Sequence, residues 1–337
     1  MRTFVRFLLF ALVAILILLA VGISLTVGWR PIIGAKSRSL TAMKFESTPQ
    51  RLERGKYLFL GVAGCAGCHS PHDISKHGAP VIEGKEGTGE VMPVDDLPGK
   101  IVAPNLTPDA ETGTGRWSDD QIARAVREGI GHDGRTLFPM MPYQHFRNMS
   151  NEDLASIIVY MRSMTPVRNE LPKTEIVFPV NYLIKGLPEP VTAPVGGPDM
   201  SNAVKRGAYL VNLGSCEDCH TPQDHGQTVE GMEFAGGQVF EGLGFSGASA
   251  NITPDASGIS YYDEALFLEV MRTGYVKARP LGPLMPFVEY RNMNEQDLKD
   301  VFAYLRTLKP VKHNVDNSEP PTLCKLCREK HGGGDKN

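Results

Sequence analysis

The sequence has few cysteines and tryptophans, and neither sign of charge is in clear excess. Its 337 residues include 6 Cys and 2 Trp, and 35 Lys and Arg stand against 38 Asp and Glu, a formal net charge of −3. Six cysteines in a chain of this length are too few for a disulfide scaffold, and the absence of a basic excess argues against nucleic acid as a partner. A composition of 42% hydrophobic and 22% charged residues excludes disorder over most of the chain. The length suits about two domains.

Every cysteine lies in a Cys-x-x-Cys pair, and two of the three pairs are followed by histidine. The two complete motifs end in His69 and His220, and their cysteines are Cys65, Cys68, Cys216 and Cys219. Cys-x-x-Cys-His is the attachment motif of c-type haem: two thiols bind the haem covalently and the histidine becomes the proximal iron ligand. A thioredoxin-like pair would need a βαβ setting, and half a zinc site would not explain the histidine. The sequence therefore predicts two covalently bound haem c groups.

The same motifs belong to an internal repeat. We define the first repeat as residues 45–169 and the second as residues 201–312. The matching segments are Arg-Gly-x-Tyr (54–57 and 206–209), Asn-Leu/Ile-Thr-Pro-Asp (105–109 and 251–255), Met-Pro-Tyr/Phe (141–143 and 285–287) and Arg-Asn-Met (147–149 and 291–293). The Gly- and Pro-rich stretch 70–104 accounts for most of the difference in length.

A second axial ligand is expected from the Met-Pro segments. Met141 and Met285 each precede proline in a loop ahead of the last helix of a repeat, so either thioether could reach back over a haem. Core packing is the commoner role of methionine. Met140 aligns with Leu284, which leaves Met141 and Met285 as the predicted iron ligands.

Helix signals dominate both repeats, so we expect an all-α fold. Ser118-x-x-Gln121 is a capping-box pattern before a helix that Gly129 can end, and residues 263–274 are its counterpart. Ser150 and Asn294 are expected to cap the last helix of each repeat. Residues 175–180 could form a short extended piece. Residues 170–200 hold several prolines and are expected to form an extended linker over the surface.

The N-terminal segment, residues 1–44, is predicted to contain a membrane anchor. Residues 7–29 are almost entirely apolar, and as a helix they would span about 35 Å, enough for a bilayer core of about 30 Å. A cleaved signal peptide is the alternative, because Arg2 and Arg6 resemble its basic start. The length favours a single-pass anchor in the inner (cytoplasmic) membrane, with the haem domains in the periplasm.

On these motifs, residues 50–312 resemble two class I cytochrome c domains in tandem. The pair is similar to the cytochrome c subunits of membrane-bound alcohol, gluconate and aldehyde dehydrogenases. The resemblance implies a mostly helical fold around each haem and a non-catalytic role, in which electrons pass from a periplasmic dehydrogenase to a quinone pool or terminal oxidase. Those subunits usually carry three haems, whereas this chain has two complete motifs. A di-haem peroxidase is the alternative, but it needs one iron with an open distal side, and both repeats carry a Met-Pro loop.

The third cysteine pair has no histidine after it. Cys324 and Cys327 are followed by Arg328, with His331 three residues further on, inside a short polar tail, residues 313–337. A local disulfide is favoured in an oxidising compartment; a small metal site with His331 or a degenerate haem motif are the alternatives. The histidines outside the haem motifs are expected to be mostly exposed: 72, 77, 132, 145, 225, 313 and 331.

Overall fold

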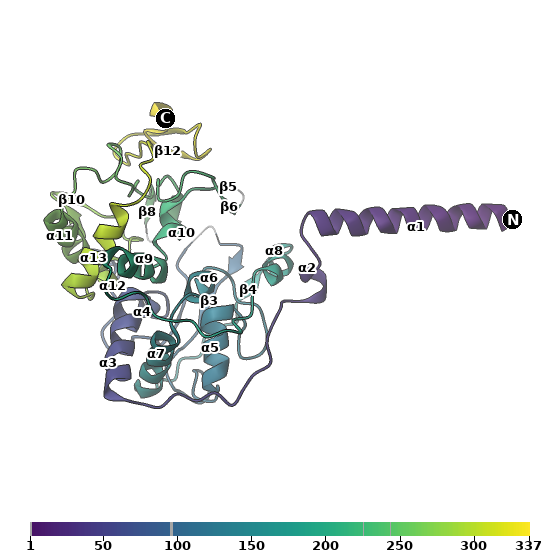
Figure 1. Ribbon diagram of the computed structural model, residues 1–337, viewed down its shortest axis with the longest axis horizontal. Coiled ribbons are helices and arrows are strands. Elements are labelled where there is room, and N and C mark those ends of the chain that lie inside the picture. The colour runs from purple at the N-terminus through teal and green to yellow at the C-terminus, as the bar shows by residue number, and fades with distance from the viewer. Residues whose placement is uncertain (1, 95–96, 225, 243) are drawn as a thin grey trace.

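In the computed structural model, two bundles of short helices follow a long N-terminal helix that projects away from them (Figure 1). The structure describes residues 2–94, 97–224, 226–242 and 244–337. The N-terminal and connecting helices are α1 (Arg2–Leu25), α2 (Arg30–Ile33), α8 (Val180–Leu183) and the 3-10 helix η2 (Ile184–Gly186). The first repeat contains α3 (Pro49–Tyr57), the π-helix η1 (Leu58–Val62), α4 (Cys65–Cys68), α5 (Asp119–Glu128), α6 (Tyr143–Phe146) and α7 (Asn151–Ser163). The second contains α9 (Ala203–Leu213), α10 (Cys216–His220), α11 (Glu264–Thr273), α12 (Phe287–Tyr290) and α13 (Glu295–Leu305).

Short antiparallel strand pairs close the loops between these helices. They are β1 (Glu90–Val91) with β3 (Val102–Ala103), β2 (Gly99–Lys100) with β4 (Glu175–Ile176), β5 (Gln223–Asp224) with β6 (Gln227–Thr228), β7 (Val239–Gly242) with β8 (Phe245–Ala248), β9 (Tyr275–Val276) with β10 (Arg279–Pro280), and β11 (Pro321–Leu323) with β12 (Lys330–Gly332). The expectation of an all-α fold therefore holds only in part. Helices make the core, but the Gly- and Pro-rich loops satisfy their backbone groups by pairing locally.

The helix boundaries follow the predicted caps. The Ser118 hydroxyl accepts from the Gln121 amide at 3.1 Å, the Gln121 side chain accepts from the Ser118 amide at 2.8 Å, and Gly129 ends α5 at φ 68°. At α11 the Asp263 side chain accepts from the Leu266 amide at 2.8 Å, and Gly274 ends the helix at φ 73°. Ser150 and Asn294 cap α7 and α13 as expected.

One glycine in each repeat allows its first and last helices to cross closely. A Cβ atom on Gly55 of α3 would lie 1.9 Å from the backbone oxygen of Ser156 in α7. A Cβ on Gly207 of α9 would lie 1.9 Å from the backbone oxygen of Asp300 in α13. The shared Arg-Gly-x-Tyr motif therefore marks the helix crossing of each repeat, since only glycine leaves room for the neighbouring backbone.

The two repeats pack face to face through reciprocal contacts. The Tyr57 hydroxyl donates to Asp297 at 2.5 Å, and the Tyr209 hydroxyl donates to Asp153 at 2.7 Å. Each tyrosine ends the Arg-Gly-x-Tyr motif of one repeat, and each aspartate lies in the first turn of the last helix of the other. Buried side chains of both repeats form one continuous hydrophobic cluster, so the repeats share a core.

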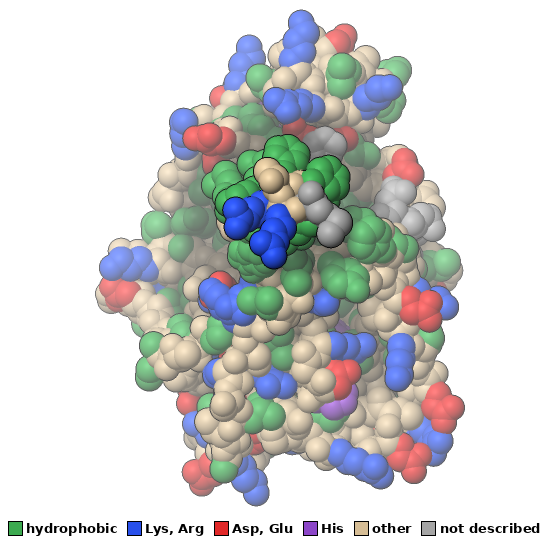
Figure 2. All heavy atoms as spheres, turned by 90° about the vertical axis from the view of Figure 1, so that its right-hand side faces the viewer, with side chains coloured by type: hydrophobic (Ala, Val, Ile, Leu, Met, Phe, Trp, Pro, Cys, Tyr) green, Lys and Arg blue, Asp and Glu red, His purple; other side chains and the backbone are tan. Residues whose placement is uncertain are grey.

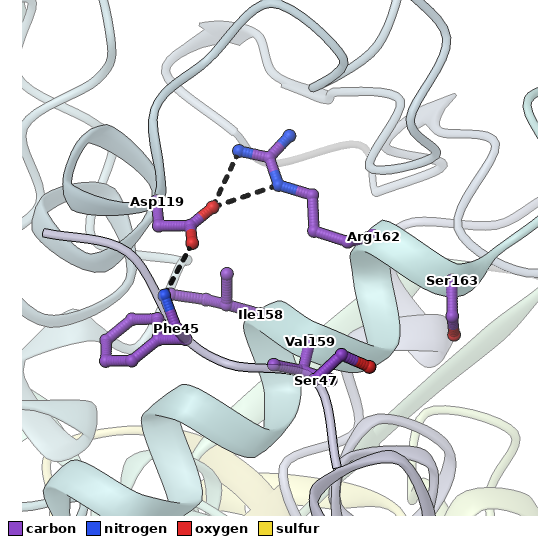
Figure 3. A pocket seen from close by; sticks show the side chains of 7 residues that line it. All are labelled: Phe45, Ser47, Asp119, Ile158, Val159, Arg162 and Ser163. Carbon is purple, nitrogen blue, oxygen red and sulfur yellow. Dashed lines mark hydrogen bonds and ion pairs between the residues drawn. The ribbon is translucent and has the colours of Figure 1, made fainter. Parts of the chain in front are cut away.

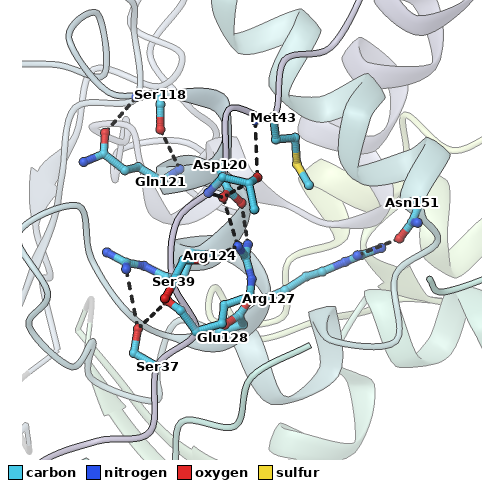
Figure 4. Close-up of polar contacts among 12 residues, drawn as sticks. Ser37, Ser39, Met43, Ser118, Asp120, Gln121, Arg124, Arg127, Glu128 and Asn151 are labelled. Carbon is cyan, nitrogen blue, oxygen red and sulfur yellow. Dashed lines mark hydrogen bonds and ion pairs between the residues drawn. The ribbon is translucent and has the colours of Figure 1, made fainter. Parts of the chain in front are cut away.

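The segment after α1 is fastened along the first repeat. We call residues 34–48 the strap. Arg38 donates to Asp120 at 2.5 and 2.9 Å and to Glu128 at 2.7 Å, and the Thr41 amide donates to Asp120 at 2.6 Å. Figure 4 shows Asp120 and Glu128 on α5, next to Ser37 and Ser39 of the strap. Both carboxylate side chains are almost fully buried, 0% and 2% exposed. The strap therefore supplies the cation that makes two buried carboxylates tolerable.

The far end of the strap covers one side of α7. The Phe45 amide donates to Asp119 at 2.9 Å, and Asp119 also pairs with Arg162 at 3.0 Å. A small pocket of about 220 Å³ lies beside these groups (Figure 3). It is formed by the strap, α7 and Asp119 of α5 rather than by either Cys-x-x-Cys-His motif.

The connection between the repeats is more structured than the sequence indicates. Residues 170–200 contain α8 and η2, and Glu175–Ile176 pairs with Gly99–Lys100. Both short helices pack against α2, next to the end of α1. An ion pair of 2.8 Å between Lys36 and Glu189 joins this connection to the strap.

Helix α1 has no buried residue and is long and apolar enough to cross a membrane. Figure 2 looks towards its N-terminal end and shows hydrophobic side chains around the helix, with basic side chains at the tip.

Candidate functional site

Each Cys-x-x-Cys pair forms a single helical turn that begins after a left-handed residue. Gly64, at φ 56°, precedes α4, and Ser215, at φ 50°, precedes α10. Residues three apart on one turn lie on the same helix face, which is the arrangement that two attachment thiols need. Partial burial raises the pKa of Cys65 to about 12, and the nearby Cys68 thiol adds to the shift.

Both motif histidines are oriented by a backbone carbonyl. His69 Nδ1 lies 2.8 Å from the oxygen of Pro104, and His220 Nδ1 lies 2.8 Å from the oxygen of Ala250. Because a carbonyl only accepts, Nδ1 carries the proton and Nε2 keeps its lone pair for a metal. Burial lowers the pKa of both imidazoles, which favours the neutral form that binds iron.

The two carbonyls are held by the Asn-x-Thr segment that follows each of them. The Asn105 side chain accepts from the Thr107 amide at 2.9 Å and donates to the Val167 oxygen at 2.7 Å. Asn251 makes the same two bonds in the second repeat, at 2.9 and 2.8 Å. This segment is a buried turn, as expected, and its role is to fix the acceptor of the motif histidine.

The Met-Pro loops of the two repeats have matching backbone bonds. The Met141 amide donates to Phe138 at 3.1 Å, and its carbonyl accepts from the Tyr143 amide at 2.8 Å. The amide and carbonyl of Met285 make the equivalent bonds, three residues back and two residues on, at 3.1 and 2.8 Å. Both methionines are partly buried against the core. Their role as iron ligands stays a prediction.

The glycine that ends the preceding helix leaves room for an aromatic ring of each Met-Pro loop. A Cβ on Gly129 would lie 2.6 Å from the ring of Tyr143, and a Cβ on Gly274 would lie 2.3 Å from the ring of Phe287. These aromatic residues follow the Met-Pro pairs directly, so the ring anchors the position of the preceding methionine.

The donor set and its surroundings fit a haem. Two thiols on one turn, an imidazole with a free Nε2 and a thioether loop are the groups that hold a c-type haem. The Tyr143 hydroxyl is buried without a hydrogen-bond partner among the described residues, and burial raises its pKa to about 12. A haem polar group would satisfy this atom. The repeat comparison did not point to Tyr143, because its counterpart is Phe287.

Each motif also rests against the Met-Pro side of the other repeat. A Cβ on Gly67 would lie 3.0 Å from the carboxylate of Glu289, whose pKa is raised to about 7 by burial. At the equivalent place, His145 pairs with Asp218 at 2.6 Å, and this hydrogen bond raises the pKa of His145. Sequence reasoning missed these residues because the contacts cross between repeats.

One tyrosine lies close to both motifs. Burial raises the pKa of Tyr290 well above its usual value, and the thiols of Cys216, Cys219 and Cys68 add to the effect. The Tyr290 hydroxyl also donates to the oxygen of Gly214, just before the second motif, at 2.6 Å.

Two aromatic residues directly precede the N-cap residues of the helices α5 and α11: Trp117 precedes Ser118, and Tyr262 precedes Asp263. Trp117 and Tyr262 are partly buried against the core, and Trp117 stacks on His132 with ring centroids 4.1 Å apart.

The expectation for the other histidines was wrong at two positions. His77 and His132 are exposed, and His72 and His145 are half-buried, whereas His225 lies outside the described residues. His313 and His331 are 0% and 2% exposed. The predicted polar tail is in fact folded: β11 and β12 form a hairpin that packs against the second repeat and buries these side chains.

The chain is similar to one family model and to several known proteins. A cytochrome c family model matches residues 52–165. A nicotinate dehydrogenase subunit of Pseudomonas putida is 33% identical over 276 residues, 77% of this chain and 21% of that protein. The cytochrome c subunit of a quinone-dependent alcohol dehydrogenase of Gluconobacter oxydans is 27% identical over 303 residues, 84% of this chain and 61% of the relative. A protein named diheme cytochrome c-type of Cereibacter sphaeroides is 30% identical over 269 residues, 77% of this chain and 86% of the relative. The chain thus spans less than two thirds of the first two.

Proposed function

Because the chain belongs to the cytochrome c family, we propose that it is a membrane-anchored two-haem electron carrier with one cytochrome c domain in each repeat. The observation that carries the proposal is the matched donor geometry. In both repeats the motif histidine donates Nδ1–H to a carbonyl at 2.8 Å, and the Met-Pro loop has the same backbone bonds.

The first haem would be held by Cys65, Cys68, His69 and Met141. The second would be held by Cys216, Cys219, His220 and Met285. Haem supplies a reversible one-electron iron couple. The protein would fix the imidazole tautomer, supply a thioether as the second ligand and shield the site with core side chains, which are the means by which a fold tunes such a couple.

The reciprocal packing suits transfer between the two sites. Gly67 of the first motif lies against Glu289 of the second repeat, and Asp218 of the second motif pairs with His145 of the first. The Tyr–Asp bonds hold the repeats in one arrangement. Two groups attached there would keep a short and constant separation. A thioether loop in both repeats also disfavours the peroxidase alternative, which needs an open iron side.

We place the carrier on the periplasmic face of the inner membrane, with α1 as a single-pass anchor. Its partner would be a dehydrogenase, because relatives are named cytochrome subunits of alcohol, fructose and gluconate dehydrogenases. The downstream acceptor would be the quinone pool or a terminal oxidase. Extraction with alkaline carbonate should leave the protein in the membrane. Release of the protein would refute the assignment of α1 as a membrane anchor.

The decisive experiment counts haems and tests their ligands. A pyridine spectrum of the purified chain should give two haems, and the ferric protein should show the near-infrared thioether-to-iron band. Met141→Ala and Met285→Ala should each retain two haems, remove about half of that band and create a high-spin site. Met140→Leu is the matched control, because Leu284 occupies the equivalent position, and it should leave the spectrum unchanged. One haem per chain, or an intact band in both alanine variants, would refute the assignment.

A further inference from the structure

Four buried side chains with metal-ligating atoms meet next to the second repeat. They are His313, Cys324, Cys327 and His331, with exposed fractions of 0%, 0%, 0% and 2%. Their ligand atoms all lie within 4.8 Å of one another. None of the four belongs to a haem motif.

The hairpin β11–β12 presents the cysteines on a tight turn. The Cys324 amide donates to the Glu329 oxygen at 2.9 Å, and the Arg328 amide donates to the Cys324 oxygen at 3.0 Å. Arg328 takes a left-handed conformation, φ 65°, to close the turn. His331 follows on β12, paired with Thr322.

The histidines turn their free nitrogens towards these thiols. His313 Nδ1 lies 2.9 Å from the oxygen of Ala235, and His313 Nε2 lies 3.4 Å from Cys324 Sγ. His331 Nδ1 lies 3.0 Å from the oxygen of Gly332. Its Nε2 is buried with no hydrogen-bond partner among the described residues. Each imidazole thus donates Nδ1–H to a carbonyl and keeps an Nε2 lone pair, as metal-bound histidines do.

We propose that these four residues bind one Zn²⁺ ion in a closed, tetrahedral Cys₂His₂ structural site. Zinc takes sulfur at about 2.3 Å and nitrogen at about 2.0–2.1 Å, so neighbouring ligand atoms in a tetrahedron lie about 3.4–3.8 Å apart. The 3.4 Å between His313 Nε2 and Cys324 Sγ falls in that range. Binding would release two thiol protons, and the two thiolates would balance the charge of the ion.

A zinc ion explains more of the cluster than the disulfide that the sequence favours. A disulfide would involve only Cys324 and Cys327 and would leave the buried Nε2 of His331 without a partner. A metal uses all four groups. Two thiolates and two imidazoles in tetrahedral array are a donor set that selects zinc.

The repeat relationship shows what the site does for the fold. In the first repeat, the Asn169 amide donates to Thr112 at 2.9 Å, and its side chain donates to the Thr88 oxygen at 2.8 Å. In the second, the His313 amide donates to Ser257 at 2.9 Å, and its ring donates to Ala235. Histidine at this place keeps both bonds and adds a ligand nitrogen.

The site therefore braces the loop beside the second motif. Ala235 precedes Gly236, whose amide donates to the His220 oxygen at 2.7 Å. A zinc ion bound through His313 would be linked to the proposed haem ligand through Ala235 and Gly236 and would stiffen its support.

The test is metal analysis of the full, haem-loaded chain, purified without chelators or metal-affinity resin. Wild-type protein should contain one zinc per chain, measured by mass spectrometry with iron as the internal reference. Zinc-edge X-ray absorption should show two sulfur and two nitrogen ligands. Cys324→Ser with Cys327→Ser, and separately His331→Asn, should lower zinc at least tenfold while the iron content stays constant. His132→Asn, at an exposed histidine, should keep the zinc.

The proposal fails if wild-type protein lacks zinc and its mass shows a Cys324–Cys327 disulfide. It also fails if zinc survives in the His331→Asn and double-serine variants, or if another metal fills the site. Because zinc and iron are measured separately, a wrong haem count would leave this result unaffected.

Discussion

Removal of Arg38 should detach the strap from the first repeat. The substitution Arg38→Ala deletes three hydrogen bonds to Asp120 and Glu128, whose side chains are 0% and 2% exposed. Breaking a buried pair by removing one partner costs about 3–5 kcal/mol, because a charge remains buried and uncompensated. Arg38 is 18% exposed, so we expect the lower end, about 3 kcal/mol, or roughly 150-fold in the detachment equilibrium.

The effect should depend on pH in a defined direction. Against the opposing effect of burial, hydrogen bonds from Arg38 and Thr41 lower the pKa of Asp120. Its contribution to stability is therefore present above the unfolded pKa of aspartate and lost as pH falls through the lower folded value. Without Arg38, burial should raise the pKa of Asp120, as it already raises that of Glu128. Protonation then removes the unpaired charges, so the defect at pH 7.5 should shrink at pH 5.

Amide hydrogen exchange measures the detachment equilibrium of the strap directly. The amides of Thr41 and Phe45 donate to Asp120 and Asp119, and they exchange when the strap opens. Their protection should fall roughly 150-fold in Arg38→Ala at pH 7.5. Arg168→Ala is the matched control: it removes pairs with Glu111 and Glu170, which are 56% and 72% exposed, and exposed pairs contribute less than about 1 kcal/mol. Equal protection in both variants would refute the strap's dependence on Arg38.

Two further perturbations test the packing. Gly55→Ala or Gly207→Ala forces a Cβ to within 1.9 Å of a backbone oxygen. Each should therefore cost about 3 kcal/mol and lower the melting temperature followed by Soret circular dichroism, whereas the control Gly196→Ala, with nothing within 4 Å, should not lower it. An unchanged melting temperature in the first two variants would contradict the crossing geometry. Tyr57→Phe and Tyr209→Phe each remove one hydrogen bond to a carboxylate, which should lower the free energy of unfolding by about 1.5–3 kcal/mol. Because the two bonds lie at separate places, their effects should add in the double variant. A single variant with wild-type stability would count against the reciprocal contacts.

Local sequence patterns predicted much of the fold. The remaining features depend on long-range contacts, which the sequence alone did not reveal. The caps at Ser118, Gly129, Ser150 and Asn294 were predictable because caps act within one turn. The pairing of Arg38 with Asp120 was not, since 82 residues separate them and neither belongs to a motif. The surroundings of the motif histidines depend on loops, yet the repeat revealed the segments that hold them.

The C-terminal cluster shows the limit most clearly. Cys324, Cys327 and His331 stand close in sequence, whereas His313 precedes the hairpin. Only the folded structure brings its imidazole to the two thiols. Composition indicated a polar tail because the hairpin buries few large apolar side chains. Its stability rests on the four buried groups and backbone bonds, which hydrophobic patterning does not register.

The exchanged Tyr–Asp bonds have a consequence for the origin of the chain. Each repeat carries the same tyrosine and the same aspartate, and each supplies both to the other. An interface in which residue i meets residue j and j meets i is isologous, the form found between identical subunits related by a two-fold axis. A single ancestral unit bearing this tyrosine and aspartate would already have been equipped to pair with itself. Joining two such units end to end would have converted a concentration-dependent dimer into one polypeptide, after which the halves could diverge, as the hairpin β11–β12 beside the second repeat illustrates.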